Sequence, residues 1–363
     1  MSGYTLYGAE VSYFTGKARA YLRWRGVPFQ ELPATQAVYR DIILPNVGWP
    51  VIPVMVTPDG AVVQDSADII DAVEAREQMR PPAIPDMPVQ RFVAQLLHLY
   101  ADEWLTLPAM HYRWSYNEDW AYGQFGALSA PQASAPEQYE IGKKNGQRFK
   151  GALPVLGVHP ETIPGIEKSY EAFLDEFSAH LAVHPFLLGG RPCLADFAFI
   201  GPLYAHLYRD PTSGEMMKRL APRVADWVER AHAGEKGTGD LMAEDGIPET
   251  LEPILARQMR EQFPALVETV ELYARWAADA APGAFVPRGL GEIWIEIEET
   301  RGPAQARTFP LYRLQAVTDA YDAMDGAAKA RADALLERVL GEPLKTFRLP
   351  KRLVRTNSRL AVA

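Results

Sequence analysis

The segment Gly48–Gly60, GWPVIPVMVTPDG, places a proline inside a run that otherwise resembles a buried β-strand. The apolar, β-branched letters of VIPVMV are typical of a strand with both faces covered, yet Pro53 has no N–H to donate to a sheet. The Pro-Asp-Gly that follows, and the next run AVVQ, predict a tight turn and a second strand. The segment therefore predicts a β-hairpin whose first strand has a proline at its entrance.

The residues around this hairpin predict a small mixed α/β unit. Residues 4–8 and 27–32 form predicted strands, separated by a helix over residues 15–26 that ends at a glycine. A weakly amphipathic segment over residues 35–44 precedes the hairpin. Residues 65–76, DSADIIDAVEAR, open with Asp and Ser and then show helical spacing, so a helix follows the hairpin. The predicted order is βαβ, helix, ββα.

The rest of the chain is predicted to be mainly helical. Residues 80–88, RPPAIPDMP, carry four prolines without apolar periodicity and indicate a linker. A long helix that Pro108 should kink follows, then a long connection over residues 117–164 with at most fragments of structure, and helices over 166–182 and 194–210. Beyond the glycine-rich residues 234–240 we expect more helix, one strand over 292–299 and a basic end. The predicted domains are 1–80, a linker at 81–87, a helical domain at 88–240 and a helical extension at 241–363.

Composition excludes several classes of protein. The 363 residues are 48% hydrophobic and 23% charged, as in ordinary globular chains, and the net charge of -9 disfavours nucleic acid as the main partner. No stretch approaches the roughly 20 apolar residues that span a bilayer, and no signal peptide is visible, so we expect a cytoplasmic protein without a membrane partner. Cys193 is the only cysteine, which excludes intrachain disulfides and thiolate metal clusters, and no metal is expected.

A βαβ unit followed by ββα, with a proline entering the strand before the hairpin, resembles the thioredoxin-like fold. Joined through a proline-rich linker to a helical region, it resembles the glutathione S-transferase superfamily. Residues 192–197, PCLADF, are similar to that family's P-S-x-A-D-F segment. The resemblance covers about residues 4–235 and implies an α/β thioredoxin-like domain followed by an all-α domain. The tail from about residue 240 is one that typical members lack.

The resemblance also implies which residues bind glutathione. In the family the proline is cis, and the residue before it offers its unpaired N–H and C=O to the cysteinyl part of glutathione, so Ile52 and Pro53 take this role. An ordinary trans proline at a strand start is the alternative. Asp65 and Ser66 occupy the position of the family's Glu-Ser or Asp-Ser pair. Asp65 is suited to the γ-glutamyl ammonium. Ser66 is expected to cap the helix and to bind the α-carboxylate. Simple helix capping without a ligand is the alternative here.

Residues 12–19, SYFTGKAR, resemble the family signature S/C-P-F-x-x-K/R-V-R at the start of the first helix. Ser12 then occupies the position that donates a hydrogen bond to the glutathione thiolate, with Tyr13 and Thr15 as alternates. A free thiol has a pKa near ~8.5, and one hydrogen bond to a charged group is worth roughly 1.5–3 kcal/mol, or about one to two pKa units. Without cysteine at residues 12 or 15, thioltransferase chemistry is disfavoured. Lys17 and Arg19 are expected to face solvent or to pair with carboxylates.

The aromatic segment 111–122, HYRWSYNEDWAY, is the predicted electrophile pocket, with His111, Tyr112, Trp114 and Tyr116 as its residues. The alternative is that these side chains form core.

The family often has a basic residue before the cis-proline strand. In this sequence Arg40 is the nearest basic residue upstream of Pro53.

The function implied by the resemblance is a detoxifying transferase that adds or exchanges the glutathione thiolate on small hydrophobic or aromatic electrophiles. Two alternatives stay open. One is a specialised glutathione-dependent lyase, isomerase or dehalogenase. The other is a non-catalytic binding or scaffold protein. A homodimer is implied by the resemblance alone.

Overall fold

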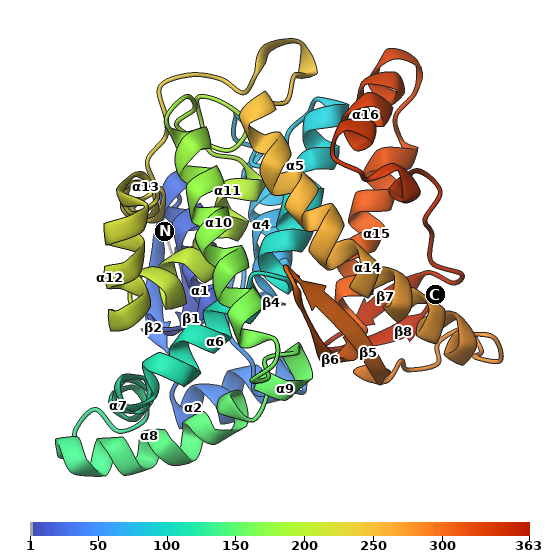
Figure 1. The fold of residues 1–363 in the computed structure, drawn as a ribbon. Coiled ribbons are helices and arrows are strands. Elements are labelled where there is room, and N and C mark those ends of the chain that lie inside the picture. Colours follow the sequence, from blue (N-terminus) through green and yellow to red (C-terminus); the bar gives the residue numbers. More distant parts are fainter. Residues whose placement is uncertain (1–2) are drawn as a thin grey trace. The chain divides into compact units, whose positions relative to one another are not determined.

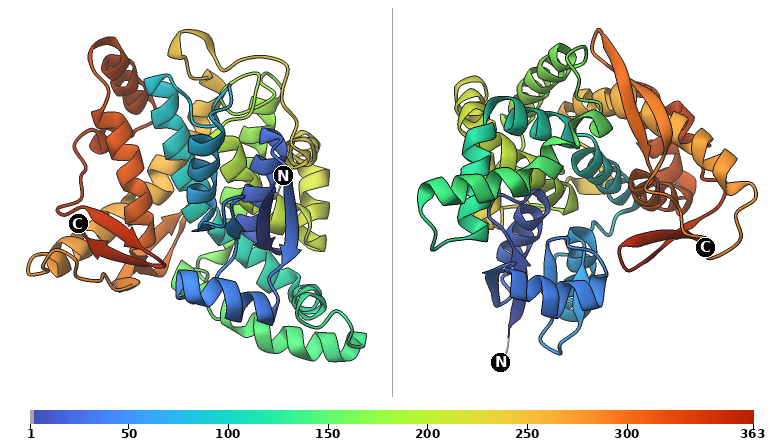
Figure 2. Two further views of the ribbon diagram at one scale, coloured as in Figure 1. Left: turned by 180° about the vertical axis from the view of Figure 1, so that it is seen from behind. Right: turned by 90° about the horizontal axis from the view of Figure 1, so that it is seen from below.

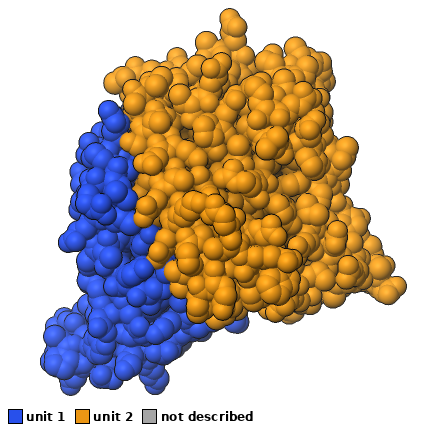
Figure 3. Space-filling view, in the orientation of Figure 1, with its two compact units in different colours: residues 1–83, 108–153, 196–236 blue, residues 84–107, 154–195, 237–363 orange. Residues whose placement is uncertain are grey.

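The computed structural model describes residues 3–363, which form two compact units (Figure 1, and coloured by unit in Figure 3). Unit 1 contains residues up to 83 together with 108–153 and 196–236. Unit 2 contains residues 84–107, 154–195 and 237–363. Residues 241–363 therefore fold into one unit with two earlier segments of the chain. The predicted domain division at residues 80, 87 and 240 stays a prediction.

Unit 1 begins with a four-stranded sheet in the order β2-β1-β3-β4. Its strands are β1 (Tyr4–Gly8), β2 (Phe29–Pro33), β3 (Val54–Val56) and β4 (Val62–Gln64). β1 pairs parallel with β2 and antiparallel with β3, and β4 is antiparallel to β3. With helix α1 between β1 and β2 and helix α4 after β4, this confirms the predicted thioredoxin-like fold. The largely helical region that follows confirms the rest of the predicted fold class.

The helices of unit 1 share the feature that most of them begin at a proline or an N-cap side chain. They are α1 (Tyr13–Arg25), α2 (Gln36–Val38), α3 (Leu44–Val47), α4 (Ser66–Glu77), α6 (Thr106–Tyr116, from Pro108 on), α7 (Glu118–Ser129), α8 (Ala135–Lys150), α11 (Leu194–Pro202, from Asp196 on), α12 (Pro211–Leu220), α13 (Pro222–Ala233) and the π-helical turns η1 (Tyr39–Ile43) and η2 (Leu203–Tyr208).

Helix α1 is buried on nearly all sides because α4, α13 and η2 all pack against it. It ends at Gly26, whose φ of 77° is the left-handed conformation that glycine adopts without strain. Lys17 and Arg19 are buried rather than solvent-facing. Arg19 Nε donates to Glu31 Oε2 at 2.5 Å, so the expected carboxylate pairing holds for this residue.

The prediction of a long connection over residues 117–164 was wrong, because α7 and α8 lie side by side there (Figure 1). A Cβ on Gly126 would lie 1.7 Å from the carbonyl oxygen of Gln138, and one on Gly142 would lie 1.8 Å from that of Tyr122. The glycines that suggest a loop therefore allow the two helices to touch. Ser134 and Glu137 form a capping box that begins α8.

Unit 2 combines helices with two antiparallel hairpins, shown as pairs of arrows in Figure 2. Its elements are α5 (Pro88–Glu103), α9 (Leu153–Leu156, from Pro154 on), α10 (Ile163–Leu181), η3 (Ala243–Asp245), η4 (Glu249–Leu251), α14 (Glu252–Ala277), β5 (Gly289–Ile297), β6 (Thr300–Arg307), α15 (Phe309–Asp322), α16 (Gly326–Arg338), η5 (Glu342–Lys345), β7 (Leu353–Thr356) and β8 (Arg359–Val362).

The predicted strand over 292–299 is β5, but its partner β6 and the hairpin β7–β8 were missed. β6 carries Gly302 and Pro303, which disfavour a strand in sequence. A two-stranded sheet tolerates the proline because each strand has an open edge. His159 further holds this segment, since its Nε2 lies 2.9 Å from the Pro303 carbonyl oxygen.

An ionic network lies inside unit 2. Arg257 of α14 is buried and donates to Glu176 of α10, to Glu261 one turn along its own helix and to Glu298 at the β5–β6 turn. Burial raises the pKa of Glu261, which also accepts from Ser169. Three carboxylates around one guanidinium thus tie three elements of this unit together.

The basic C-terminal segment lies on acidic residues of the same unit. Arg352 pairs with Asp319 at 2.6 Å, Arg348 pairs with Asp322, and Lys345 pairs with Glu337 at 2.8 Å. These contacts hold the segment against acidic side chains of α15 and α16. Within residues 3–363, no helix combines the length and apolar character needed to cross a membrane.

Candidate functional site

The sheet register brings the three sequence motifs of the thioredoxin-like domain to one end of the sheet. Tyr7 of β1 is paired with Val54 of β3, which is paired in turn with Gln64 of β4. The next positions toward this end of the sheet are Gly8 after β1, Pro53 before β3 and Asp65 after β4. Because neighbouring strands are about 4.7–4.9 Å apart, these positions are close neighbours. We call Ser12, Ile52, Pro53, Asp65 and Ser66 the Ser12 site.

Ser12 is the N-cap of α1 and stands in extended conformation, with φ -85° and ψ 124°. Its half-buried hydroxyl accepts a hydrogen bond from the backbone N–H of Thr15 at 3.3 Å. A serine hydroxyl has one proton to donate in addition to its acceptor capacity. Ser12 can therefore cap the helix and still donate to a ligand at the positive end of the helix dipole.

The Ile52–Pro53 peptide bond is cis, as predicted. Pro53 is buried and Ile52 is half-buried, just outside β3. Among residues 3–363, neither backbone group of Ile52 takes part in a hydrogen bond between backbone groups. The backbone of Ile52 thus has the donor and the acceptor that an extended peptide ligand requires.

The prediction that Ser66 caps α4 was wrong, because Asp65 is the cap. Asp65 Oδ1 accepts from the backbone N–H of Ala67 at 2.9 Å, and Ser66 is the first helical residue. Ser66 is only 2% exposed. The φ of Asp65 is 86°, a conformation that costs a non-glycine residue about 1–3 kcal/mol. Backbone strain of this kind is concentrated at ligand-binding sites.

The alternates Tyr13 and Thr15 are both buried in unit 1. The Thr15 hydroxyl has no hydrogen-bond partner in the described chain, and a Cβ on Gly8 would lie 2.2 Å from the Thr15 methyl carbon, so Thr15 packs tightly on Gly8. The Tyr13 ring meets His206 edge to face, with 5.5 Å between the ring centroids. Burial lowers the pKa of His206 well below its usual range, and the charges of Arg113 and Arg209 lower it further.

The aromatic segment on α6 is mostly core. Trp114 packs with Ala121 and Tyr122 inside the cluster formed by α6, α7 and α8. His111 and Tyr112 are buried as well, and Ser115 Oγ lies 3.0 Å from His111 Nδ1. Tyr116 is 51% exposed and stacks on Tyr112, with 5.6 Å between ring centroids. Of the four predicted pocket residues, Tyr116 alone offers most of its ring to solvent.

Arg40, the nearest cation upstream of Pro53, is exposed and forms an ion pair with its neighbour Asp41 at 2.6 Å. Surface pairs of this kind contribute about 0–1 kcal/mol, so the guanidinium is easily diverted to another anion. Within residues 3–363, no group of three or more His, Cys, Asp or Glu side chains is arranged to hold a metal ion.

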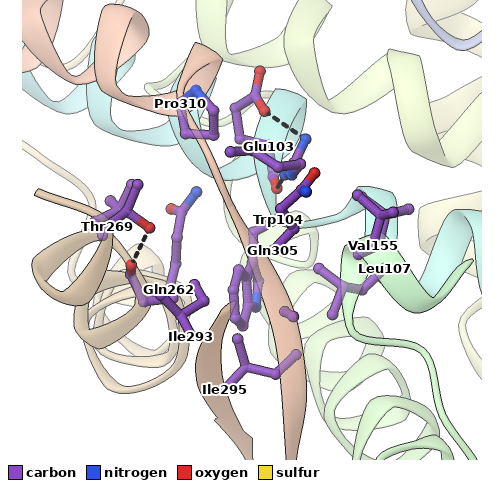
Figure 4. A pocket seen from close by; sticks show the side chains of 15 residues that line it. Glu103, Trp104, Leu107, Val155, Gln262, Thr269, Ile293, Ile295, Gln305 and Pro310 are labelled. Atoms are coloured by element: carbon purple, nitrogen blue, oxygen red, sulfur yellow. Dashed lines mark hydrogen bonds and ion pairs between the residues drawn. The ribbon is translucent and has the colours of Figure 1, made fainter. Parts of the chain in front are cut away.

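A small pocket that is partly open to solvent lies entirely in unit 2 (Figure 4). Trp104, Leu107, Ile293 and Ile295 contribute much of its apolar wall. At one side Arg307 Nη1 donates to Glu103 Oε2 at 3.1 Å, so the charges there are balanced. None of the residues predicted for substrate binding lines this pocket.

Comparison with known proteins gives a family match for the first domain. Residues 6–81 match the family model of the glutathione S-transferase N-terminal domain. None of the curated proteins matches the sequence.

Solved structures with a similar chain trace include several glutathione S-transferases. The Tau class enzyme from mango, Mangifera indica, is 19% identical, with a TM-score of 0.43 over 68% of this chain and 94% of that one. A glutathione S-transferase of Ceriporiopsis subvermispora in complex with glutathione is 14% identical, with a TM-score of 0.45 over 66% and 100%. The beta-etherase LigF from Sphingobium is 17% identical, with a TM-score of 0.46 over 64% and 97%.

The matched residues run from β1 to just beyond α4, so they include the whole Ser12 site. The match assigns residues 6–81 to the glutathione S-transferase N-terminal domain.

Proposed function

We propose that the protein is a glutathione transferase-like enzyme that adds or exchanges the glutathione thiolate on small hydrophobic electrophiles. The observation that carries the proposal is the register of β1, β3 and β4, which sets Gly8, Pro53 and Asp65 side by side at the end of the sheet that leads to Ser12, Ile52 and Ser66.

Each part of glutathione has a matching group in this site. The N–H and C=O of Ile52 suit the backbone of the cysteinyl residue. Ser66 and the N–H groups at the start of α4 suit the α-carboxylate of the γ-glutamyl residue, because a helix N-terminus favours an anion. Asp65 suits the neighbouring ammonium group. These groups would orient the thiol without taking part in its chemistry.

Ser12 supplies the chemical activation in this proposal. Its hydroxyl donates to the thiolate while it accepts from Thr15 N–H. A hydrogen bond to a charged sulfur, worth roughly 1.5–3 kcal/mol, lowers the thiol pKa by about one to two units from ~8.5. Much of the bound thiol is then nucleophilic near neutral pH, and it attacks the electrophilic carbon of the second substrate.

The electrophile is proposed to bind at the aromatic segment of α6. The predicted residues are His111, Tyr112, Trp114 and Tyr116, and Tyr116 is the most exposed of the four. An aromatic or extended apolar electrophile fits such a ring.

The test is a titration with glutathione in which the thiolate absorbance of the bound ligand is followed against pH. We expect an ionisation well below that of free glutathione, and we expect Ser12→Ala to lose that shift. Thr15→Val is the matched control, because the hydroxyl it removes is buried without a partner. Tyr13→Phe tests the other alternate in the same way.

Three results would redirect the proposal. A shift that depends on Tyr13 or Thr15 would move the catalytic role to that residue. A normal shift without turnover of generic electrophiles would favour a specialised lyase, isomerase or dehalogenase. Absence of glutathione binding would favour a non-catalytic binding or scaffold protein.

We further propose a cytoplasmic homodimer, by analogy with the superfamily. Sedimentation equilibrium at micromolar concentration should give twice the mass of the chain, and a stable monomer would contradict this part.

A further inference from the structure

The loop Ala9–Ser12 joins β1 to α1, and both polar groups of its last peptide unit are hydrogen-bonded. The N–H of Ser12 donates to the carbonyl of Ala9 at 3.0 Å. The carbonyl of Val11 accepts from Arg113 Nη1 at 2.9 Å. A peptide unit is a rigid plane that includes the next Cα, so these two bonds together fix where the Ser12 side chain starts.

Arg113 is itself held on several sides. It is 2% exposed, and its Nε and Nη2 donate to the two carboxylate oxygens of Asp210 at 2.7 and 2.8 Å. Nη2 also donates to the carbonyl of Ala205 at 2.5 Å. Asp210 is 0% exposed and stands just before α12. A paired, forked guanidinium in such surroundings has little freedom to move.

The other side-chain contacts of the loop are weaker anchors. Arg19 Nη2 reaches the carbonyl of Ala9 at 3.4 Å, and Glu10 pairs with Arg19 at 3.1 Å. The side chain of Glu10 is nearly half exposed, where ion pairs contribute little. Tyr204 also donates to the exposed carboxylate of Glu10, and Arg209 lies 3.9 Å from it. The bond from Arg113 to Val11 differs from these contacts because it is buried and holds the loop by its backbone.

We propose that Arg113 is a positioning residue for Ser12, acting through the Val11 carbonyl, with Asp210 holding the guanidinium in place. The proposal rests on the proposed function of Ser12 and adds a residue that the family motif of the first helix does not contain. Arg113 touches neither the thiol nor the electrophile in this scheme. It keeps the Ser12 hydroxyl at one position, so that the thiolate meets a donor that is already aligned.

The test variant is the double substitution R113M/D210L, which removes both buried charges and so leaves none uncompensated. Arg113→Lys is a milder second variant, because it keeps a positive charge opposite Asp210 but replaces the fork of donors by one ammonium group. R25M/E74Q is the matched control. Arg25 is a buried arginine of the same unit that pairs with Glu74 and donates to the Pro81 carbonyl.

Three measurements decide the question in each folded variant. Amide hydrogen exchange of Ser12 should become about tenfold faster in R113M/D210L, the factor that corresponds to losing roughly one hydrogen bond. Binding of S-methylglutathione, which has no thiol, should stay unchanged. The pKa of bound glutathione should return most of the way toward the free value, as in Ser12→Ala. Arg113→Lys should show the same changes in smaller degree, and R25M/E74Q should show none of them.

Unchanged Ser12 exchange in folded R113M/D210L or Arg113→Lys would overturn the positioning role. So would a loosened loop with an unchanged thiol pKa. If wild-type protein binds glutathione without lowering its pKa, the proposed function fails, and faster Ser12 exchange in the variants would still support Arg113 as the anchor of the loop. The exchange and thiol measurements therefore separate the two claims.

Discussion

Asp65 Oδ1 accepts a hydrogen bond from the N–H of Ala67 at 2.9 Å while the Asp65 backbone stands at φ 86°. One side chain thus caps α4 from a conformation that most residues avoid. Aspartate and asparagine tolerate positive φ better than other non-glycine residues, and both can cap a helix. Capping and charge at this position can therefore be tested separately.

Asp65→Ala should lower the free energy of unfolding by about 2 kcal/mol, because it loses the cap and keeps a strained φ. Asp65→Asn should change it by no more than about 0.5 kcal/mol. If Asp65 binds the γ-glutamyl ammonium, Asp65→Asn should nevertheless weaken glutathione binding roughly tenfold or more, the loss expected for one charged hydrogen bond. Urea unfolding and calorimetric titration measure the two effects. Unchanged affinity in Asp65→Asn would remove Asp65 from the ligand site.

The contact between α7 and α8 predicts opposite effects for two glycines on the same helix. Gly126→Ala would bring a Cβ to 1.7 Å from a backbone oxygen of α8, so it should destabilise the protein by about 1–3 kcal/mol or more. Gly123→Ala is the control, since a Cβ there meets nothing within 4 Å. It should stabilise the protein by up to about 1 kcal/mol through helix propensity. Thermal melting of both variants checks this, and equal shifts would mean that α7 and α8 are not in contact.

The parts of the fold that could be predicted are those with short-range signals. The Pro-Asp-Gly turn, the glycine that ends α1 and the helical spacing after Asp65 all act within a few residues. The order of strands then follows from the resemblance. The place of the Ser12 site at one end of the sheet could be predicted for the same reason, because each of its motifs lies at the end of one element. Its role in binding stays a proposal.

The parts that were missed depend on contacts between distant residues. Gly126 and Gly142 suggest a loop until the partner helix is known. The buried state of Lys17 depends on the helices that cover α1. Arg113 and Asp210 are 97 residues apart, and no local pattern indicates that they meet. The sequence also does not show whether Asp65 or Ser66 caps α4, because both residue types are good N-caps.

The network around Arg257 predicts a large stability difference between two neighbouring arginines. Arg257→Met should cost about 3–5 kcal/mol, because it leaves the buried carboxylate of Glu261 without its partner. Arg260→Met is the control on the same helix. Its side chain is half exposed and its carboxylate contacts are 3.7 and 3.8 Å, so the change should be within about 1 kcal/mol. Urea unfolding of both variants measures the change in unfolding free energy. Similar losses in the two variants would show that the network around Arg257 does not contribute the expected stability.

His232 predicts how stability depends on pH. Its ring stacks on Tyr204, Arg19 Nη1 donates to its Nε2 at 3.1 Å, and burial followed by the charges of Arg19 and Arg23 lowers its pKa to about 3. An unfolded histidine has a pKa of about 6.5, so between these values the unfolded chain binds a proton that the folded chain does not. The free energy of unfolding should therefore fall as pH drops through this window, by up to about 1.4 kcal/mol per pH unit for this residue.

His232→Gln should reduce the slope of the unfolding free energy against pH by about that amount, as measured by urea unfolding between about pH 6 and pH 4. Above about pH 7 the two slopes should coincide, because histidine is neutral in both states there. Identical slopes throughout the acid range would mean that His232 is protonated in the folded protein.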